Sequence, residues 1–159
     1  MKINSNVKVV VEKGAKLTLE TSVIYGPMEV KGTLSTVSSE SGHLHSTINN
    51  RLTLKDGAIL ENATLLSHAR YLTDGNLSIA DEPAMIITEG TVTVKEKNTI
   101  TADKGASALK GQNAIEVRGT LHIEKNALLT AQGGGDDANF FMPAGGDAIS
   151  KGIRKKIIG

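Results

Sequence analysis

The feature that most constrains the fold of this chain is a short frame of alternating apolar residues that recurs along it. In each copy, two apolar residues separated by one other residue precede a short turn, after which two or three more apolar residues alternate in the same phase. Alternation with a period of two predicts β-strands that have one buried face, and helical spacing is not sustained anywhere. Copies of the frame begin at Val9, Leu52, Leu77, Val92 and Leu121.

The spacing of the copies indicates how the strands are arranged. The copies are separated by 43, 25, 15 and 29 residues, and a weaker copy over residues 28–34 divides the first interval. A fixed frame at irregular intervals favours stacked coils whose loops differ in length, because hairpins have short and even spacing. One coil cannot bury its own apolar row, whereas parallel stacking at ~4.8 Å would bury it. The sequence therefore predicts a β-solenoid.

The frame also predicts which residues stack and where the chain bends. Gly14 and Gly57 occupy the same position in their copies, where a bend would require positive φ, and Asn98 and Asn126 lie near that position. The narrow interior suits a chain with only 3% aromatic residues and no Trp. We expect two ladders of buried residues along one axis: Val9, Leu52, Leu77, Val92 and Leu121 in the first, and Leu17, Leu60, Met85, Ile100 and Leu129 in the second.

Composition and charge exclude several classes of function. A formal charge of +1 removes the electrostatic case for a nucleic-acid partner, and no apolar run approaches the ~18 residues of a membrane span. The chain has no Cys, and thus no disulfide, thiolate metal site or Cys nucleophile. Residues 1–6 contain no apolar segment of a signal peptide, so we expect any such signal to be absent from this chain.

The last residues depart from the frame. Lys151, Arg154, Lys155 and Lys156 place four positive charges in the last nine residues. We expect a solenoid domain over 1–150, followed over 151–159 by a basic tail or a truncated next rung. An incomplete rung exposes strand edges, which favours end-to-end self-association.

A longer pattern in the second half of the chain resembles a known family. Thr101-Ala102 leads through a Gly-containing loop to 111–115 (Gly-Gln-Asn-Ala-Ile), and Thr130-Ala131 leads to 145–149 (Gly-Gly-Asp-Ala-Ile). This pattern resembles the right-handed parallel β-helix repeats of bacterial surface and adhesin-type proteins, in the pectin-lyase-like β-solenoid superfamily. The resemblance covers residues 75–150 well. We therefore expect an all-β, single-stranded right-handed parallel β-helix of about seven irregular rungs.

The richest cluster of candidate ligand residues lies in one loop of the second half. It combines hard oxygen ligands with an apolar platform, next to three consecutive glycines. Its composition resembles a calcium-binding Gly/Asp loop, although its spacing differs from the nonapeptide calcium motif. We expect no cofactor. Calcium is the one ion that the composition of this loop would suit. The candidate ligand-binding residues are Asp136, Asp137, Asn139, Phe140, Phe141 and Asp147.

Signs of catalysis are weaker. His43 and His45 would share one face of a strand, but their Ser- and Thr-rich surroundings are typical of a solvated loop, and we expect no metal there. Polysaccharide-acting β-helix enzymes carry paired Asp residues or an Arg on an outward face, and the outward positions here are mostly Lys, Thr, Ser and Glu. We therefore expect no catalytic residues.

The sequence favours a non-catalytic structural or adhesive module of a larger bacterial protein that is secreted or on the cell surface. Its partner would be a host or cell-wall polysaccharide or a protein. Two alternatives from other classes stay open: a polysaccharide-acting lyase or hydrolase, or a fragment of one, and a cytosolic scaffold that self-assembles. Convergence of acidic residues on one outward face would distinguish the enzyme from the adhesin.

Overall fold

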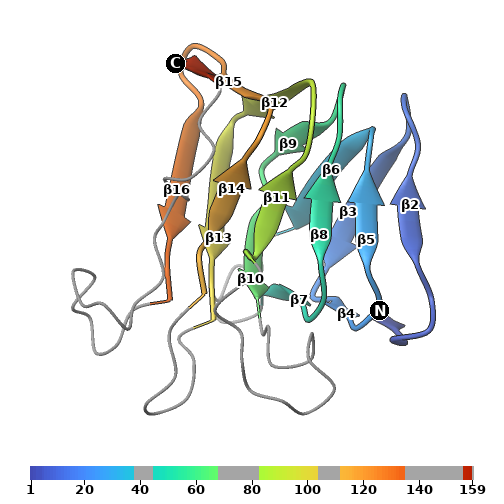
Figure 1. Ribbon diagram of the computed structural model, residues 1–159. Coiled ribbons are helices and arrows are strands. Elements are labelled where there is room, and N and C mark those ends of the chain that lie inside the picture. The colour runs from blue at the N-terminus through green and yellow to red at the C-terminus, as the bar shows by residue number, and fades with distance from the viewer. Residues whose placement is uncertain (38–44, 68–82, 104–111, 135–155, 159) are drawn as a thin grey trace.

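The computed structural model describes residues 1–37, 45–67, 83–103, 112–134 and 156–158 (Figure 1). The regular structure in these ranges is β-strand throughout. No helix in them is long and apolar enough to cross a membrane.

The strands form three parallel sheets that run along the molecule (Figure 1). Sheet A contains, in spatial order, β1 (Lys2–Ile3), β4 (Val23–Ile24), β7 (Ser46–Ile48), β10 (Thr64–Ser67), β13 (Lys97–Thr101) and β16 (Leu128–Gln132). Sheet B contains β2 (Val9–Val11), β5 (Met28–Val30), β8 (Leu52–Leu54), β11 (Met85–Ile87) and β14 (Ile115–Val117). Sheet C contains β3 (Lys16–Glu20), β6 (Thr33–Val37), β9 (Ile59–Glu61), β12 (Thr91–Lys95), β15 (Thr120–Ile123) and β17 (Lys156–Ile158).

The chain visits the sheets in the order A, B, C, and one such circuit is a coil. Coil 1 is β1 to β3, coil 2 is β4 to β6, and within sheets A and B each strand pairs in parallel with the strand three places later. Connections between parallel strands of one sheet are almost always right-handed, and the coil has this hand (Figure 1). The prediction of an all-β, single-stranded parallel β-helix is confirmed. The described strands make five complete coils and two strands of a sixth, against about seven expected.

The inward ladder of sheet B corrects the first predicted row. Val9 and Leu52 do share a ladder, and Met28 of the weaker copy lies between them as predicted. Val92 and Leu121, however, pair with each other in sheet C. Leu77 lies outside the described residues, and β8 pairs directly with β11. The ladder of sheet B is Val9, Met28, Leu52, Met85 and Ile115.

The second predicted row is divided among all three sheets. Leu17 and Leu60 belong to sheet C, Met85 to sheet B, and Ile100 and Leu129 to sheet A. The cause is that the turn from sheet B to sheet C and the turn from sheet C to sheet A are both short. Each turn joins two alternating strands, so a frame of strand, turn and strand describes either corner equally well.

The core is the narrow space between the three sheets. Leu34, Leu54 and Leu60 are completely buried there, and each belongs to a strand with covered neighbours on both sides. In the part of the chain that the structure describes, the buried hydrophobic side chains are those of Val, Leu, Ile, Met and Ala. An interior built from such small side chains explains why a chain almost free of aromatic residues has a core.

The corners use positive φ angles, as predicted at three of four positions. Gly14 and Gly57 have φ of +83° and +86° between sheets B and C, and Asn126 has φ of +69° between sheets C and A. Asn98 differs from the expectation, because the left-handed residue at that corner is Glu96, with φ of +61°. The side chain of Asn98 is buried instead. Its Oδ1 accepts a hydrogen bond from the backbone N–H of Ala63, in the neighbouring coil, at 2.9 Å.

Strand β8 provides a direct test of which face is buried. Leu54→Ala should lower the free energy of unfolding by ~2–5 kcal/mol, because it leaves a cavity in the stacked interior. Thr53→Ala, one residue earlier and facing outward, should cost ~1 kcal/mol or less. Urea unfolding of both variants measures the difference. Equal losses would contradict the assignment of inward and outward faces.

Candidate functional site

The outer face of sheet B carries the most connected group of charges that the structure describes. The residues that alternate with the inward ladder form an outward row, which consists of Val10, Glu29, Thr53, Ile86 and Glu116. Glu29 stands at the centre of β5, between two apolar residues that point into the core. Its side chain is only 15% exposed because longer side chains from three coils close around it.

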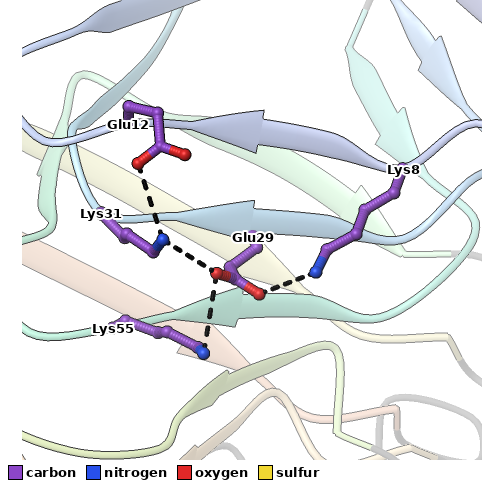
Figure 2. Close-up of polar contacts among 5 residues, drawn as sticks. All are labelled: Lys8, Glu12, Glu29, Lys31 and Lys55. Carbon is purple, nitrogen blue, oxygen red and sulfur yellow. Dashed lines mark hydrogen bonds and ion pairs between the residues drawn. The ribbon is translucent and has the colours of Figure 1, made fainter.

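Three lysines converge on this carboxylate (Figure 2). Lys8 Nζ, from coil 1, donates to Glu29 Oε2 at 3.0 Å. Lys31 Nζ lies 3.5 Å from Glu29 Oε1, and Lys55 Nζ, from coil 3, lies 3.6 Å from the same oxygen. Lys31 also lies 3.5 Å from Glu12 Oε2. These five side chains are called the Glu29 cluster.

The electrostatics of the cluster hold Glu29 in its charged form. The hydrogen bond from Lys8 lowers the pKa of Glu29, and the charges of Lys55, Lys8 and Lys31 act in the same direction, whereas partial burial opposes them. A carboxyl group with a lowered pKa is ionised at neutral pH. Glu29 therefore accepts hydrogen bonds and ties coils together, and it has no proton to donate to a substrate.

Three other outward carboxylates also contact a cationic side chain. On sheet B, Arg118 Nε donates to Glu116 Oε1 at 2.6 Å. On sheet C, Lys16 Nζ donates to Glu61 Oε2 at 2.7 Å across two coils, and Lys95 Nζ lies 3.8 Å from Glu124 Oε1. The outer faces therefore carry charges that are largely matched by charges on the same or neighbouring coils.

The sequence predicted that outward positions are mostly Lys, Thr, Ser and Glu, but it did not predict the Glu29 cluster. Lys8 is separated from Glu29 by 21 residues, and their contact depends on the stacking register of coils 1 and 2. The one available signal was the position of Glu29 between Met28 and Val30, since a charge inside an alternating apolar strand must face outward.

The predicted ligand-binding residues Asp136, Asp137, Asn139, Phe140, Phe141 and Asp147 lie outside the described residues. The structure does describe the strand that precedes them, β16, which lies next to β13 and then β10 in sheet A. Residues 68–82, 104–111 and 135–155, which the structure does not describe, come after β10, β13 and β16 in the sequence.

The histidines are not brought together where the structure describes them. His45 is exposed before β7, and His43 lies outside the described residues. His122 is half-buried on the outer face of β15, opposite Thr93 of β12. In the described ranges, no three His, Cys, Asp or Glu side chains form a group that could hold a metal ion.

The pH dependence of stability tests the Glu29 cluster. Because its folded pKa is lowered, Glu29 contributes stability that is fully present above its unfolded pKa of about 4.3 and is lost as the pH falls through the folded value. Glu29→Gln should lower the free energy of unfolding by about 1 kcal/mol at pH 7, and the difference from the parent protein should shrink near pH 3. Urea unfolding at both pH values measures it.

Glu12→Gln is the matched control. Glu12 is 68% exposed and lies 3.5 Å from a single lysine, so its removal should cost clearly less at pH 7. A loss for Glu29→Gln that is equally large at both pH values would show that the ionised carboxylate is not what stabilises the coils.

Comparison with known proteins leaves the family of this chain open. No protein-family model, curated protein or solved structure matches it.

Proposed function

We propose that this chain is a non-catalytic structural and adhesive module of a larger bacterial protein that is secreted or displayed on the cell surface. The observation that carries the structural part is the way charges join the coils. Glu29 of coil 2 contacts Lys8 of coil 1 and Lys55 of coil 3. Lys16 of coil 1 reaches Glu61 of coil 3. Such contacts stiffen a column of coils. They also pair carboxylates that would otherwise be available for a reaction on the outer face.

The chemistry of Glu29 favours this role over catalysis. A general acid that protonates a glycosidic oxygen needs a raised pKa, so that it carries a proton at neutral pH. The pKa of Glu29 is lowered, since its neighbours are cations. A polysaccharide-acting enzyme is the alternative proposal from a different class, and it predicts turnover that the structural module lacks.

The adhesive part of the proposal concerns the corner where the chain leaves sheet A. A rigid stack holds the carboxyl ends of β10, β13 and β16 side by side. Binding groups are more often carried on loops that a rigid scaffold positions than on the scaffold itself. The candidate ligand residues between 136 and 147 follow β16 in the sequence. The resemblance to bacterial surface β-helix repeats supports a glycan or protein partner and an extracellular location.

Turnover assays separate the module from the enzyme. The chain is incubated with acidic and neutral polysaccharides, and the formation of new reducing ends and of unsaturated uronate products is followed over hours. We expect no product above a heat-denatured control. Product formation that scales with protein concentration, and survives further purification, would refute the non-catalytic proposal.

Calcium tests the proposed loop. The melting temperature should rise at ~10 mM calcium, because extracellular calcium sites bind in the range of about 0.1–1 mM and binding to the folded state stabilises it. A variant with Asp136→Asn and Asp137→Asn should not respond, and sodium chloride of equal ionic strength controls for screening. An unchanged melting temperature in the parent protein would remove calcium from the proposal and leave the structural part intact.

A further inference from the structure

Coil 1 is one end of the described solenoid, and its strand edges and core are open. Strands β1, β2 and β3 are the outermost strands of sheets A, B and C at the same end. Among the described residues, three of the five exposed large hydrophobic side chains lie on this coil: Met1, Val7 and Val10. The inward residues Ile3, Val9 and Leu17 are only partly buried, whereas their counterparts in coil 2 are covered.

The backbone of β2 shows which groups the open edge presents. Val9 N–H donates to the carbonyl of Pro27 at 2.9 Å, and the Val11 carbonyl accepts from Lys31 N–H at 2.8 Å. Successive residues of a strand direct these groups to opposite sides, so Val10 directs its N–H and C=O away from β5. Lys8 and Glu12 flank β2, and the Glu12 carbonyl accepts a hydrogen bond from Ala15 N–H at 2.9 Å, so Val10 is the residue whose backbone groups the edge presents.

These residues have a self-complementary order. If β2 pairs antiparallel with β2 of a second copy and Val10 faces Val10, then Lys8 of each copy faces Glu12 of the other. The two Val10 residues would exchange their N–H···O=C hydrogen bonds, which is the hydrogen-bonded type of antiparallel pair. Lys8 is 55% exposed and Glu12 is 68% exposed, so both side chains are accessible at this end while they contact Glu29 and Lys31 of their own chain.

The charges also select this register. Moving the centre of the pairing from Val10 to Lys8 would place Lys8 opposite Lys8, and moving it to Glu12 would place Glu12 opposite Glu12. Like charges directly opposite each other destabilise a strand pair. The register centred on Val10 instead extends the Glu29 cluster, since Lys8 would lie between Glu29 of its own chain and Glu12 of the second copy.

The rest of coil 1 follows the same symmetry. Ile3 precedes Val10 by seven residues and Leu17 follows it by seven, and both are inward residues that are only partly buried. A two-fold axis through the Val10 pair would set β1 against β3 of the second copy, which brings the partly buried Ile3 and Leu17 to the same interface. The open core of one copy would thus meet the open core of the other.

We propose that two copies of this chain associate head to head through coil 1, with β2 paired antiparallel about Val10. The interface is isologous, because one surface serves both partners. It extends sheet B across both copies and gives the N–H and C=O of Val10 hydrogen-bond partners. This pairing does not depend on what the outer faces or loops bind, so it stands apart from the proposed function.

Complementary charge variants test the pairing. Light scattering after gel filtration should give the parent protein twice the 16.7 kDa mass of one chain. Lys8→Glu alone, or Glu12→Lys alone, should raise the dissociation constant of the dimer by about tenfold or more, since both changes place like charges opposite each other. An equal mixture of the two variants should recover the dimer, because the carboxylate introduced in one variant then faces the ammonium group introduced in the other. Lys125→Glu, the same charge change in an exposed turn of a distant coil, should leave the dimer unchanged.

Disulfide trapping tests the register residue by residue. The chain has no cysteine, so Val10→Cys introduces one thiol, and it should form a disulfide-linked dimer under mild oxidation. Thr53→Cys lies in the same outward row, two coils away, and should stay unlinked. Far-UV circular dichroism of each variant confirms that the fold persists.

Three results would overturn the proposal. The first is a parent protein that stays monomeric at ~100 μM, which would assign the open edge to another occupant, such as a further coil of a longer chain. The second is a parent protein that forms a dimer, together with an equal mixture of the Lys8→Glu and Glu12→Lys proteins that does not form one. The third is a dimer that is linked through Thr53→Cys and not through Val10→Cys.

Discussion

The structure depends on the stacking of each coil on the next. An isolated coil has a narrow row of apolar side chains and no partner for its backbone N–H and C=O groups. Stacking solves both problems at once, because the parallel ladders pair the backbone while Leu34, Leu54 and Leu60 become buried in the shared interior. Loop length is then free to vary, which explains why successive inward residues of sheet B are 19, 24, 33 and 30 positions apart.

Polar side chains maintain the stacking where the sheets end. At the corner between sheets C and A, Thr36 Oγ1 accepts a hydrogen bond from Thr64 N–H at 3.0 Å and donates one to the Asn62 carbonyl at 3.1 Å. Asn98 bridges the next coil in a similar way. The Glu29 cluster does the equivalent on the outside of sheet B. Interior and surface polar groups thus serve the same coil-to-coil contact, which supports the structural role that we propose.

The sequence predicted what depends on local alternation. It indicated the strands, the apolar character of the core, the weaker copy at 28–34, and the positive φ of Gly14 and Gly57, because each follows from a few neighbouring residues. It predicted the ladders only in part, because the corner after sheet B and the corner after sheet C have the same local pattern, and residues of different sheets were joined in one row. It did not predict the Glu29 cluster, whose contacts between coils depend on a register between residues 19 or more positions apart. The loop that carries Asp136 and Asp137 lies outside the described residues.

The central claim is that strands far apart in sequence lie next to each other in parallel. Nuclear Overhauser contacts between backbone protons of Val30 test it most directly. The account predicts cross-strand contacts from Val30 to Val11 on one side and to Leu54 on the other, in the slanted pattern of parallel pairs. Contacts from Val30 to residues 33–37 in an antiparallel pattern would mean that the chain folds into hairpins, and would contradict the stacked coil.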